Sequence, residues 1–279
     1  MPREVLYVLV LMAAVGHAVW NALIKGSGDR VLMMAAIRLV GLLFGLGVLL
    51  FVSGPSRASW PWLMTAALAH YAYYALLIWS YGIGEMSLVY PLARGSAPVL
   101  LAGLAFLAVG ERLSRGQAAG VGLASIGILI LAFGPGRDLR ACGVALLNGA
   151  TIAGYSFCGG VGVRSAGTVL GFQAWLEILT GIGMLTFAVA SRGRSIFPFA
   201  RASGGRGLMA GVISVAGYLA FLAAVTVLPL APVAALRETS AIFGTVLGAV
   251  VFREEFGLLR ISAASLATAG IVALALSTA

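Results

Sequence analysis

The chain has 279 residues, of which 61% are hydrophobic and 10% are charged, with a formal net charge of +9. Soluble domains carry about 25% charged residues to hydrate their surface, so this composition excludes an ordinary soluble enzyme and indicates an integral membrane protein. The basic charge does not indicate nucleic acid as a partner. The arginines fall mainly between apolar segments, where contact with membrane lipids and the positive-inside bias explain them.

Ten apolar segments of spanning length follow one another along the chain. A transmembrane helix needs roughly 20 apolar residues, and glycine, proline, arginine and polar clusters interrupt this sequence at about that interval. We therefore expect an all-α integral membrane protein with ten transmembrane helices. The short loops leave no room for a soluble domain, so any function must lie within the bundle or at its surface. The predicted spans are residues 5–24, 31–52, 60–82, 87–109, 117–133, 139–159, 170–190, 207–227, 231–252 and 258–276.

An internal repeat relates the two halves of the chain. A shift of 143 residues superposes Arg94 on Arg237, and the segment LASIGILIL at 123–131 on LATAGIVAL at 266–274. Five spans per half is an odd number, so the second half is expected to enter the membrane inverted relative to the first. Secondary transporters commonly have this architecture. The expected five-helix repeats are residues 1–135 and 136–279.

Several motifs resemble those of the drug/metabolite transporter superfamily, in particular its EamA-like members. They are HAVWNALIKG at 17–26, VYPLARGSAP at 89–98 with GERLS at 110–114, GxxLxxxGIxxL at 120–131, and APVAALRETSAIFGTVLGAVVFREEF at 231–256. The resemblance implies a multi-pass secondary carrier of the plasma (inner) membrane, often an exporter, and not an enzyme. It implies alternating access around a central cavity between the repeats, and it names no substrate. One departure is the acidic Glu255, where the first half has Arg112.

The membrane orientation is left open by the loop charges. The resemblance implies cytoplasmic termini, and the basic residues in the loops of the first half agree with that orientation. The loops of the second half carry most of their arginines on the opposite side, which favours the inverted orientation.

Five charged residues fall about seven or eight positions inside predicted spans. A charge at the bilayer centre costs about 2.5 to 3.5 kcal/mol on insertion scales, so each should face a cavity or a partner. Helical spacing places Arg94 and Arg237 at the heads of two stripes of small residues, the second of which includes Gly244 and Gly248. We predict that these two helices pack closely, with the two arginines at opposite ends of the contact. The five are Arg38, Arg94, Glu177, Arg237 and Glu238.

Two roles are open for these charges. Arg94 and Arg237 can bind an anionic group of a substrate, because the guanidinium fork suits carboxylate and phosphate, or they can pair structurally with Glu177 and Glu238. Neighbours on a helix point about 100° apart, so Arg237 and Glu238 are expected to find partners on other helices. Each glutamate can couple transport to protons or stay ionised beside an arginine, which we favour. Arg38 is a candidate for a similar lock.

Aromatic and polar side chains on the predicted spans can build a substrate pocket, because such pockets are mostly apolar with a few placed polar groups. Other aromatic residues near the span ends, among them Tyr81, are expected in the interfacial belt. No cofactor is expected, and no metal, because the two histidines lack further ligands nearby. The pocket candidates are His17, Trp20, Asn21, His70, Tyr74, Tyr155, Trp175 and Tyr218.

The expected partner is a small anionic or zwitterionic molecule, bound by a monomer or a homodimer. The alternative is a non-transporting membrane protein, such as an integral-membrane enzyme or a subunit that flips lipid-linked intermediates. A flippase would require a groove open sideways to the bilayer.

Overall fold

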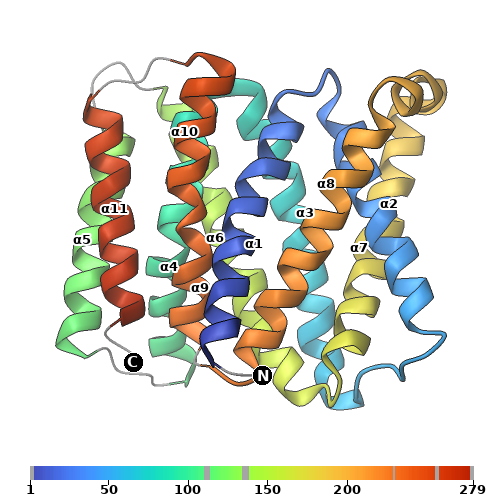
Figure 1. Ribbon diagram of the computed structural model, residues 1–279, viewed down its shortest axis with the longest axis horizontal. Coiled ribbons are helices and arrows are strands. Elements are labelled where there is room, and N and C mark those ends of the chain that lie inside the picture. The colour runs from blue at the N-terminus through green and yellow to red at the C-terminus, as the bar shows by residue number, and fades with distance from the viewer. Residues whose placement is uncertain (1–2, 110–113, 134–137, 229, 255–257, 277–279) are drawn as a thin grey trace.

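The computed structural model describes residues 3–109, 114–133, 138–228, 230–254 and 258–276. Helices form all the regular structure in these ranges, which confirms the all-α prediction. Helix α1 begins and α11 ends at the lower edge of the bundle (Figure 1). Glu111, Arg112 and Glu255 lie outside the described residues. The α-helices are α1 Arg3–Lys25, α2 Arg30–Val48, α3 Trp60–Ile83, α4 Met86–Val109, α5 Arg115–Phe133, α6 Leu139–Ser165, α7 Val169–Arg192, α8 Ile196–Val225, α9 Leu230–Glu238, α10 Ser240–Phe252 and α11 Leu258–Leu276.

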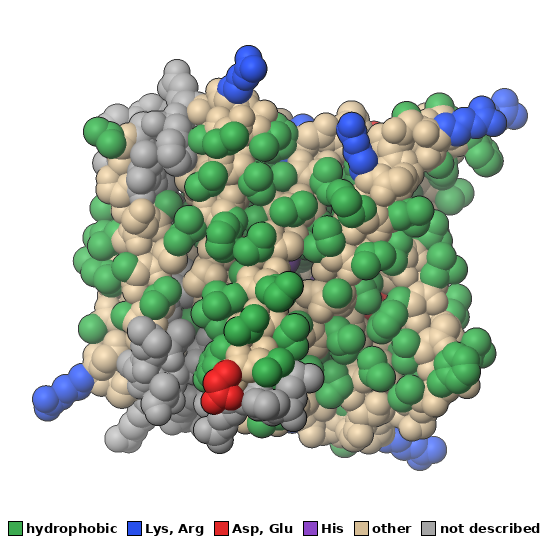
Figure 2. Space-filling view, in the orientation of Figure 1, with side chains coloured by type: hydrophobic (Ala, Val, Ile, Leu, Met, Phe, Trp, Pro, Cys, Tyr) green, Lys and Arg blue, Asp and Glu red, His purple; other side chains and the backbone are tan. Residues whose placement is uncertain are grey.

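Six helical segments of the described chain are long and apolar enough to cross a membrane. Hydrophobic side chains cover the middle of the face shown in Figure 2, and Lys and Arg side chains project from its upper and lower edges. This distribution fits a bilayer, whose hydrocarbon core excludes charge and whose surfaces attract it. The chain is therefore an all-α membrane protein. The six segments are Glu4–Lys25, Arg30–Val48, Met86–Ala108, Leu139–Ser165, Val169–Val225, which contains α7 and α8, and Val233–Phe252.

The predicted span at 231–252 is divided into α9 and α10 at Thr239. The backbone N–H of Thr239 donates to Leu236 O at 3.3 Å, and its hydroxyl donates to the same oxygen at 2.6 Å. A side chain that bonds the preceding turn competes with the regular helical ladder, and the sequence pattern did not predict this break. Helix α8 also begins at Ile196, before the predicted 207.

Each helix packs mainly against helices far from it in the sequence. The main neighbours are α5 with α11, α2 with α7, α3 with α6 and α1 with α8, and α4 lies against both α6 and α10. Helices α5 and α11 form a closely spaced pair at the left of Figure 1. A methyl group added at Gly127 would overlap the backbone of Ala267, and one added at Gly270 would overlap that of Ala124. Glycine is therefore required for this approach.

Helices α4 and α10 pack closely, as predicted, but the α4 residues that meet Gly244 and Gly248 come before Arg94 and are not its stripe of small residues. A side chain at Gly244 would collide with the ring of Tyr90, and one at Gly248 would collide with the backbone of Ser87. The carboxylate of Glu254, two residues beyond α10, accepts hydrogen bonds from the backbone N–H groups of Met86 and Ser87, both at 2.7 Å. Glu254 therefore caps the N-terminus of α4 and holds it against the end of α10.

Cationic side chains cap helix C-termini at opposite edges of the bundle. Lys25, the last residue of α1, donates from Nζ to Tyr81 O at 3.1 Å and to Gly84 O at 2.6 Å, at the end of α3. Arg164, near the end of α6, donates from Nε to Val225 O at 2.8 Å and from Nη2 to Leu228 O at 3.1 Å, at the end of α8. A cation suits a helix C-terminus, where carbonyl groups lack partners within the helix.

Candidate functional site

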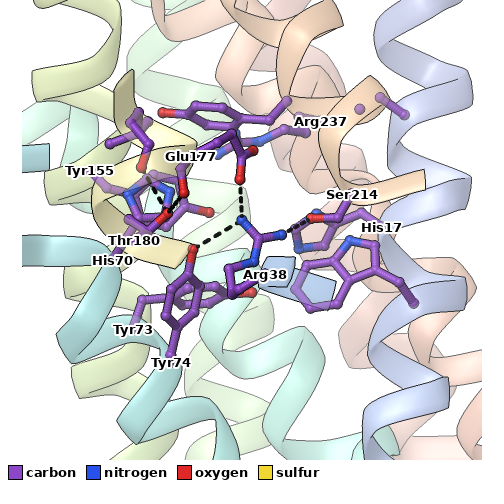
Figure 3. Close-up of a pocket in the computed structure, with 15 residues that line it drawn as sticks. His17, Arg38, His70, Tyr73, Tyr74, Tyr155, Glu177, Thr180, Ser214 and Arg237 are labelled. Carbon is purple, nitrogen blue, oxygen red and sulfur yellow. Dashed lines mark hydrogen bonds and ion pairs between the residues drawn. The ribbon is translucent and has the colours of Figure 1, made fainter. Parts of the chain in front are cut away.

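A cavity lies inside the bundle, between α1, α2, α3, α6, α7, α8 and α9 (Figure 3). Its unfilled space is ≈ 540 Å3, of which only a small part is wide enough for water. We call it the central cavity. Nine of the thirteen residues predicted for binding, coupling or gating line it: His17, Trp20, Arg38, His70, Tyr74, Tyr155, Glu177, Tyr218 and Arg237.

Arg38 on α2 holds together one wall of the central cavity. Its Nη1 lies 2.8 Å from Glu177 Oε2 on α7 and donates to Tyr74 Oη on α3 at 3.2 Å, and its Nη2 donates to Ser214 Oγ on α8 at 2.6 Å. Figure 3 shows the guanidinium at the centre of these three partners. Glu177, which was offered as a partner for Arg94 or Arg237, thus pairs with Arg38 instead, and the interactions of Arg38 join four helices.

A group of aromatic rings around His70 forms a neighbouring wall, which shares Tyr74 with the Arg38 wall. The His70 ring stacks on Tyr155 with centroids 4.1 Å apart and meets the edge of Tyr218 at 5.5 Å. His70 Nδ1 is 2.8 Å from Ala66 O in the preceding turn of α3. The rings of Tyr73 and Tyr74 lie 6.4 Å and 5.8 Å from His70. Such a wall offers flat apolar faces together with polar edges, a combination typical of small-molecule sites.

A second charged group lies where α9 ends. Glu238 Oε2 is 2.6 Å from Arg94 Nε, and Glu238 Oε1 is 3.3 Å from Arg237 Nη2. Arg237 also donates from Nη2 to Ser156 Oγ at 2.7 Å and lies over the ring of Phe221 at 4.1 Å. One carboxylate is therefore shared by two guanidinium groups, of which only that of Arg237 reaches the central cavity.

Two predictions about these residues need correction. Arg237 and Glu238 do contact each other, because the long Arg237 side chain brings Nη2 to 3.3 Å from Glu238 Oε1. The expected partners on other helices are present as well, namely Arg94 for Glu238 and Ser156 for Arg237. Arg94 and Arg237 are not at opposite ends of the helix contact, since both reach the same carboxylate.

The buried charges do not balance. Three arginines and two glutamates are buried among the described residues. Arg38 and Glu177 neutralise each other, whereas Arg94, Arg237 and Glu238 together keep one net positive charge. A positive charge inside a membrane protein is costly unless it is compensated. The wall that contains Arg237 is therefore suited to a negatively charged group.

The central cavity also presents polar atoms without hydrogen-bond partners in the described chain. They are His17 Nε2, Arg38 Nε and Tyr218 Oη, all buried. Buried polar groups are usually paired, because leaving them unpaired costs about 1–3 kcal/mol each. Arg38 Nε can only donate and Tyr218 Oη can donate, so a ligand with acceptor oxygens would satisfy both.

Four predicted residues lie elsewhere. Asn21 and Arg94 line a smaller cavity with an unfilled space of ≈ 220 Å3, in which Tyr81 Oη donates to Asn21 Oδ1 at 2.9 Å. Tyr81 is thus buried and does not belong to an interfacial belt. Glu238 reaches the central cavity only through its contact with Arg237. Trp175 packs on Trp60 with ring centroids 5.2 Å apart, outside the central cavity.

Helical spacing explains why one residue was wrongly predicted to line the central cavity and why two lining residues were not predicted. Trp175 lies two positions before Glu177, and two helical positions are about 200° apart, so the two side chains face different sides of α7. Thr180 and Ser214 line the central cavity but were not predicted. Thr180 is one turn after Glu177 and Ser214 is one turn before Tyr218, so both shared a face with predicted residues.

Comparisons with known proteins address the fold alone. No protein-family model matches the sequence, and no curated protein matches it. A solved structure described only as "Crystal structure of protein" superposes with a TM-score of 0.71 and 15% sequence identity, over 99% of this chain and 97% of that chain. The two chains therefore share a fold over nearly their whole lengths.

Proposed function

We propose that this protein is a secondary-active transporter of a small anionic or zwitterionic metabolite and that the central cavity is its binding site. The observation that carries the proposal is the net positive charge of Arg94, Glu238 and Arg237, part of which faces the cavity. A carboxylate or phosphate beside Arg237 would supply the missing negative charge and two acceptor oxygens. The aromatic wall around His70 would hold the rest of the molecule.

We further propose two inverted five-helix repeats, residues 1–135 and 136–279. The helix pairings support this layout: with α1 equivalent to α6 and α3 to α8, the α1–α8 contact corresponds to the α6–α3 contact. Helices α2 and α7 begin after the N-caps Asp29 and Thr168, which are 168 − 29 = 139 positions apart. Arg38 and Glu177 are separated by the same 139 positions, so they occupy equivalent places on the two helices.

Two further contacts repeat under this symmetry. Gly127 and Gly270, 270 − 127 = 143 positions apart, approach the backbones of Ala267 and Ala124, which are also 143 apart. Lys25 caps α3 at one edge of the bundle, and Arg164 caps α8 at the other edge. A pseudo-two-fold axis that lies in the membrane plane and relates the two repeats would generate such pairs of contacts. Many secondary carriers have this symmetry.

Alternating access gives the proposed cycle. The narrow central cavity cannot admit a metabolite without movement of its walls, so substrate entry requires the helices on one side to separate. The break between α9 and α10 falls beside Arg237 and Glu238, where a change in the charge pairing can be transmitted to both short helices. We also propose that the chain is an EamA-like member of the drug/metabolite transporter superfamily, in the plasma (inner) membrane.

A thermal-shift screen tests the binding site. Purified protein is heated with small carboxylates, phosphates, amines and neutral solutes, because a ligand that binds only the folded state raises the melting temperature. Anionic or zwitterionic compounds are expected to raise it for wild type and for Arg57→Gln, which changes an exposed arginine at the lower edge. They should not raise it for Arg237→Gln. Equal shifts in all three proteins would reject the anion site.

Transport itself is tested with the compounds that bind. They are offered in labelled form to proteoliposomes loaded with unlabelled compound, and exchange across the membrane is measured. Exchange that is present for wild type and absent for Arg237→Gln supports the carrier. Binding without exchange under either direction of gradient would reject it and leave a binding protein.

A lipid flippase is the second candidate, because the described part of the bundle contains a groove with an open side. That groove lies near the ends of α1 and α10 and shares no described lining residue with the central cavity. A flippase needs a polar path across the bilayer for the headgroup. The groove does not connect to the central cavity through any described lining residue, so the two do not form such a path. Translocation of a labelled lipid in the same proteoliposomes, in the absence of solute exchange, would favour the flippase.

A further inference from the structure

A hollow with an open side lies near the upper edge of the bundle, outside the central cavity. It is bounded by α1, α8 and α10 and by Met33 of α2, and Figure 1 shows the upper part of α1 between α8 and α10. Its unfilled space is ≈ 900 Å3, including the open side. We call it the lateral groove. The proposed transport function assigns it no role.

The floor of the lateral groove is apolar. Helix α1 contributes Val19, Ala22 and Leu23, which share one helical face, and α10 contributes Leu247 and Val251, one turn apart. Val251 is 57% exposed in the bundle, so this apolar strip is open to the surroundings. An exposed apolar strip in a membrane protein is suited to hydrocarbon.

The upper end of the lateral groove combines polar and basic residues with the apolar Phe252, whose ring lies against Gly26. Ser203 and Arg206, one turn apart on α8, and the loop residues Ser27 and Gly28 line it. Arg206 is the only charged side chain among the described lining residues, and it has no ion-pair partner in the described chain. Exposed Arg201 and Arg194 lie nearby in sequence and add to the positive charge of this edge.

We infer that the lateral groove binds one anionic phospholipid, with its phosphate at Arg206 and an acyl chain along α1 and α10. The polar end is at the edge of the bundle and the apolar end points toward its middle, which matches the order of headgroup and hydrocarbon in a bilayer leaflet. The membrane supplies such lipids at high local concentration, so this source is favoured over a free fatty acid.

Native mass spectrometry of the detergent-purified protein tests the inference. The protein is titrated with phosphatidylglycerol, with phosphatidylcholine of the same acyl chains, and with oleate. One saturable phosphatidylglycerol adduct is expected at concentrations where phosphatidylcholine gives little. Arg206→Gln should weaken that adduct about fivefold, because one arginine near an anionic headgroup contributes ~1 kcal/mol. Arg206→Lys should keep most of the affinity.

Two variants separate the lateral groove from general basic charge. Arg201→Gln removes an exposed arginine five positions earlier on α8 and should leave the adduct unchanged. Ala22→Phe fills the apolar floor and should reduce phosphatidylglycerol binding while Arg206 is retained. Equal binding of the two phospholipids, a single saturable adduct with oleate alone, or equal effects of Arg201→Gln and Arg206→Gln would overturn the inference.

Discussion

Arg38 and Glu177 form a buried ion pair, with Nη1 and Oε2 2.8 Å apart and side chains only 6% and 3% exposed. The pair joins α2 to α7 in the wall of the central cavity, and the guanidinium bonds Tyr74 and Ser214 as well. The hydrogen bonds offset part of the cost of taking both charges out of water. Loss of either partner would leave the other charge buried alone.

The first prediction concerns this pair. Glu177→Gln or Arg38→Gln should lower the free energy of unfolding by about 3–5 kcal/mol, because each leaves one uncompensated buried charge. The double variant Arg38→Met with Glu177→Leu should lose less than either single variant. Denaturant titration in mixed micelles measures wild type, the two single variants and both double variants described here. Losses that simply add in a matched Arg38→Gln, Glu177→Gln double variant would show that the two residues are not coupled.

The second prediction concerns the net charge around the shared carboxylate of Glu238, which two substitutions change in opposite directions. Arg94→Gln brings the group of Arg94, Glu238 and Arg237 to zero net charge, and Glu238→Gln raises it to two positive charges. Affinity for an anionic ligand should fall about tenfold in the first variant and rise in the second, since a unit charge roughly 12 Å from the ligand contributes about 1.4 kcal/mol at an effective dielectric constant of about 20. Calorimetric titration with a compound from the thermal-shift screen measures both. Changes of the same sign would contradict the electrostatic account.

The third prediction tests the close approach of α5 and α11. Gly127→Ala should destabilise the protein by about 1–3 kcal/mol, because the new methyl group overlaps the backbone of α11. Gly122→Ala, on the same helix, has open space around it and should be neutral or stabilising by up to ~1 kcal/mol. Thermal unfolding in detergent compares them. A Gly127→Ala protein as stable as Gly122→Ala would refute the predicted clash.

The fourth prediction concerns the cap on α4. Glu254→Ala should cost about 1–2 kcal/mol, because the N–H groups of Met86 and Ser87 lose their acceptor. Glu254→Gln should cost less, since its amide oxygen still accepts one of the bonds. Arg253→Ala, at the exposed neighbouring position, is the matched control. Hydrogen exchange at the start of α4 should rise for Glu254→Ala alone, and unchanged exchange there would exclude the cap.

The fifth prediction is the membrane orientation. The upper edge of the described chain carries the larger share of the basic residues, and the lower edge carries Arg57, Arg115 and Arg164. The positive-inside bias places the richer edge in the cytoplasm and both termini outside, opposite to the orientation that the family resemblance implies. The basic residues of the upper edge are Lys25, Arg30, Arg140, Arg192, Arg194, Arg201, Arg206 and Arg253.

Thiol labelling decides the orientation. Ala58→Cys at the lower edge and Ser195→Cys at the upper edge are exposed positions, and each is introduced into a chain whose two native cysteines are replaced by serine. A membrane-impermeant maleimide should label Ala58→Cys in right-side-out vesicles and Ser195→Cys only after permeabilisation. The reverse pattern would place the termini in the cytoplasm.

Composition and helical spacing predicted much of this molecule, and they failed where the answer depends on tertiary contacts. The burial of Arg38 and Glu177 followed from the cost of exposing charge to lipid. Their pairing depends on how α2 packs on α7, across 139 residues of chain. Likewise, the break at Thr239 coincides with hydrogen bonds from its N–H and hydroxyl groups to Leu236 O, and no hydrophobic periodicity reports it. Trp175 was wrongly assigned to the substrate pocket, although helical spacing alone places its side chain on a different face of the helix from Glu177.

The Arg38–Glu177 pair has an evolutionary consequence under the proposed symmetry. Two identical half-length chains assembled as an antiparallel dimer, about a two-fold axis in the membrane plane, would place the same residue on both sides of that axis. Arginine would then face arginine, or glutamate would face glutamate. Under that symmetry, a homodimeric ancestor would have needed other side chains at this point. The opposite charges would then date from after duplication and fusion, and each half would depend on the charge that its sister carries.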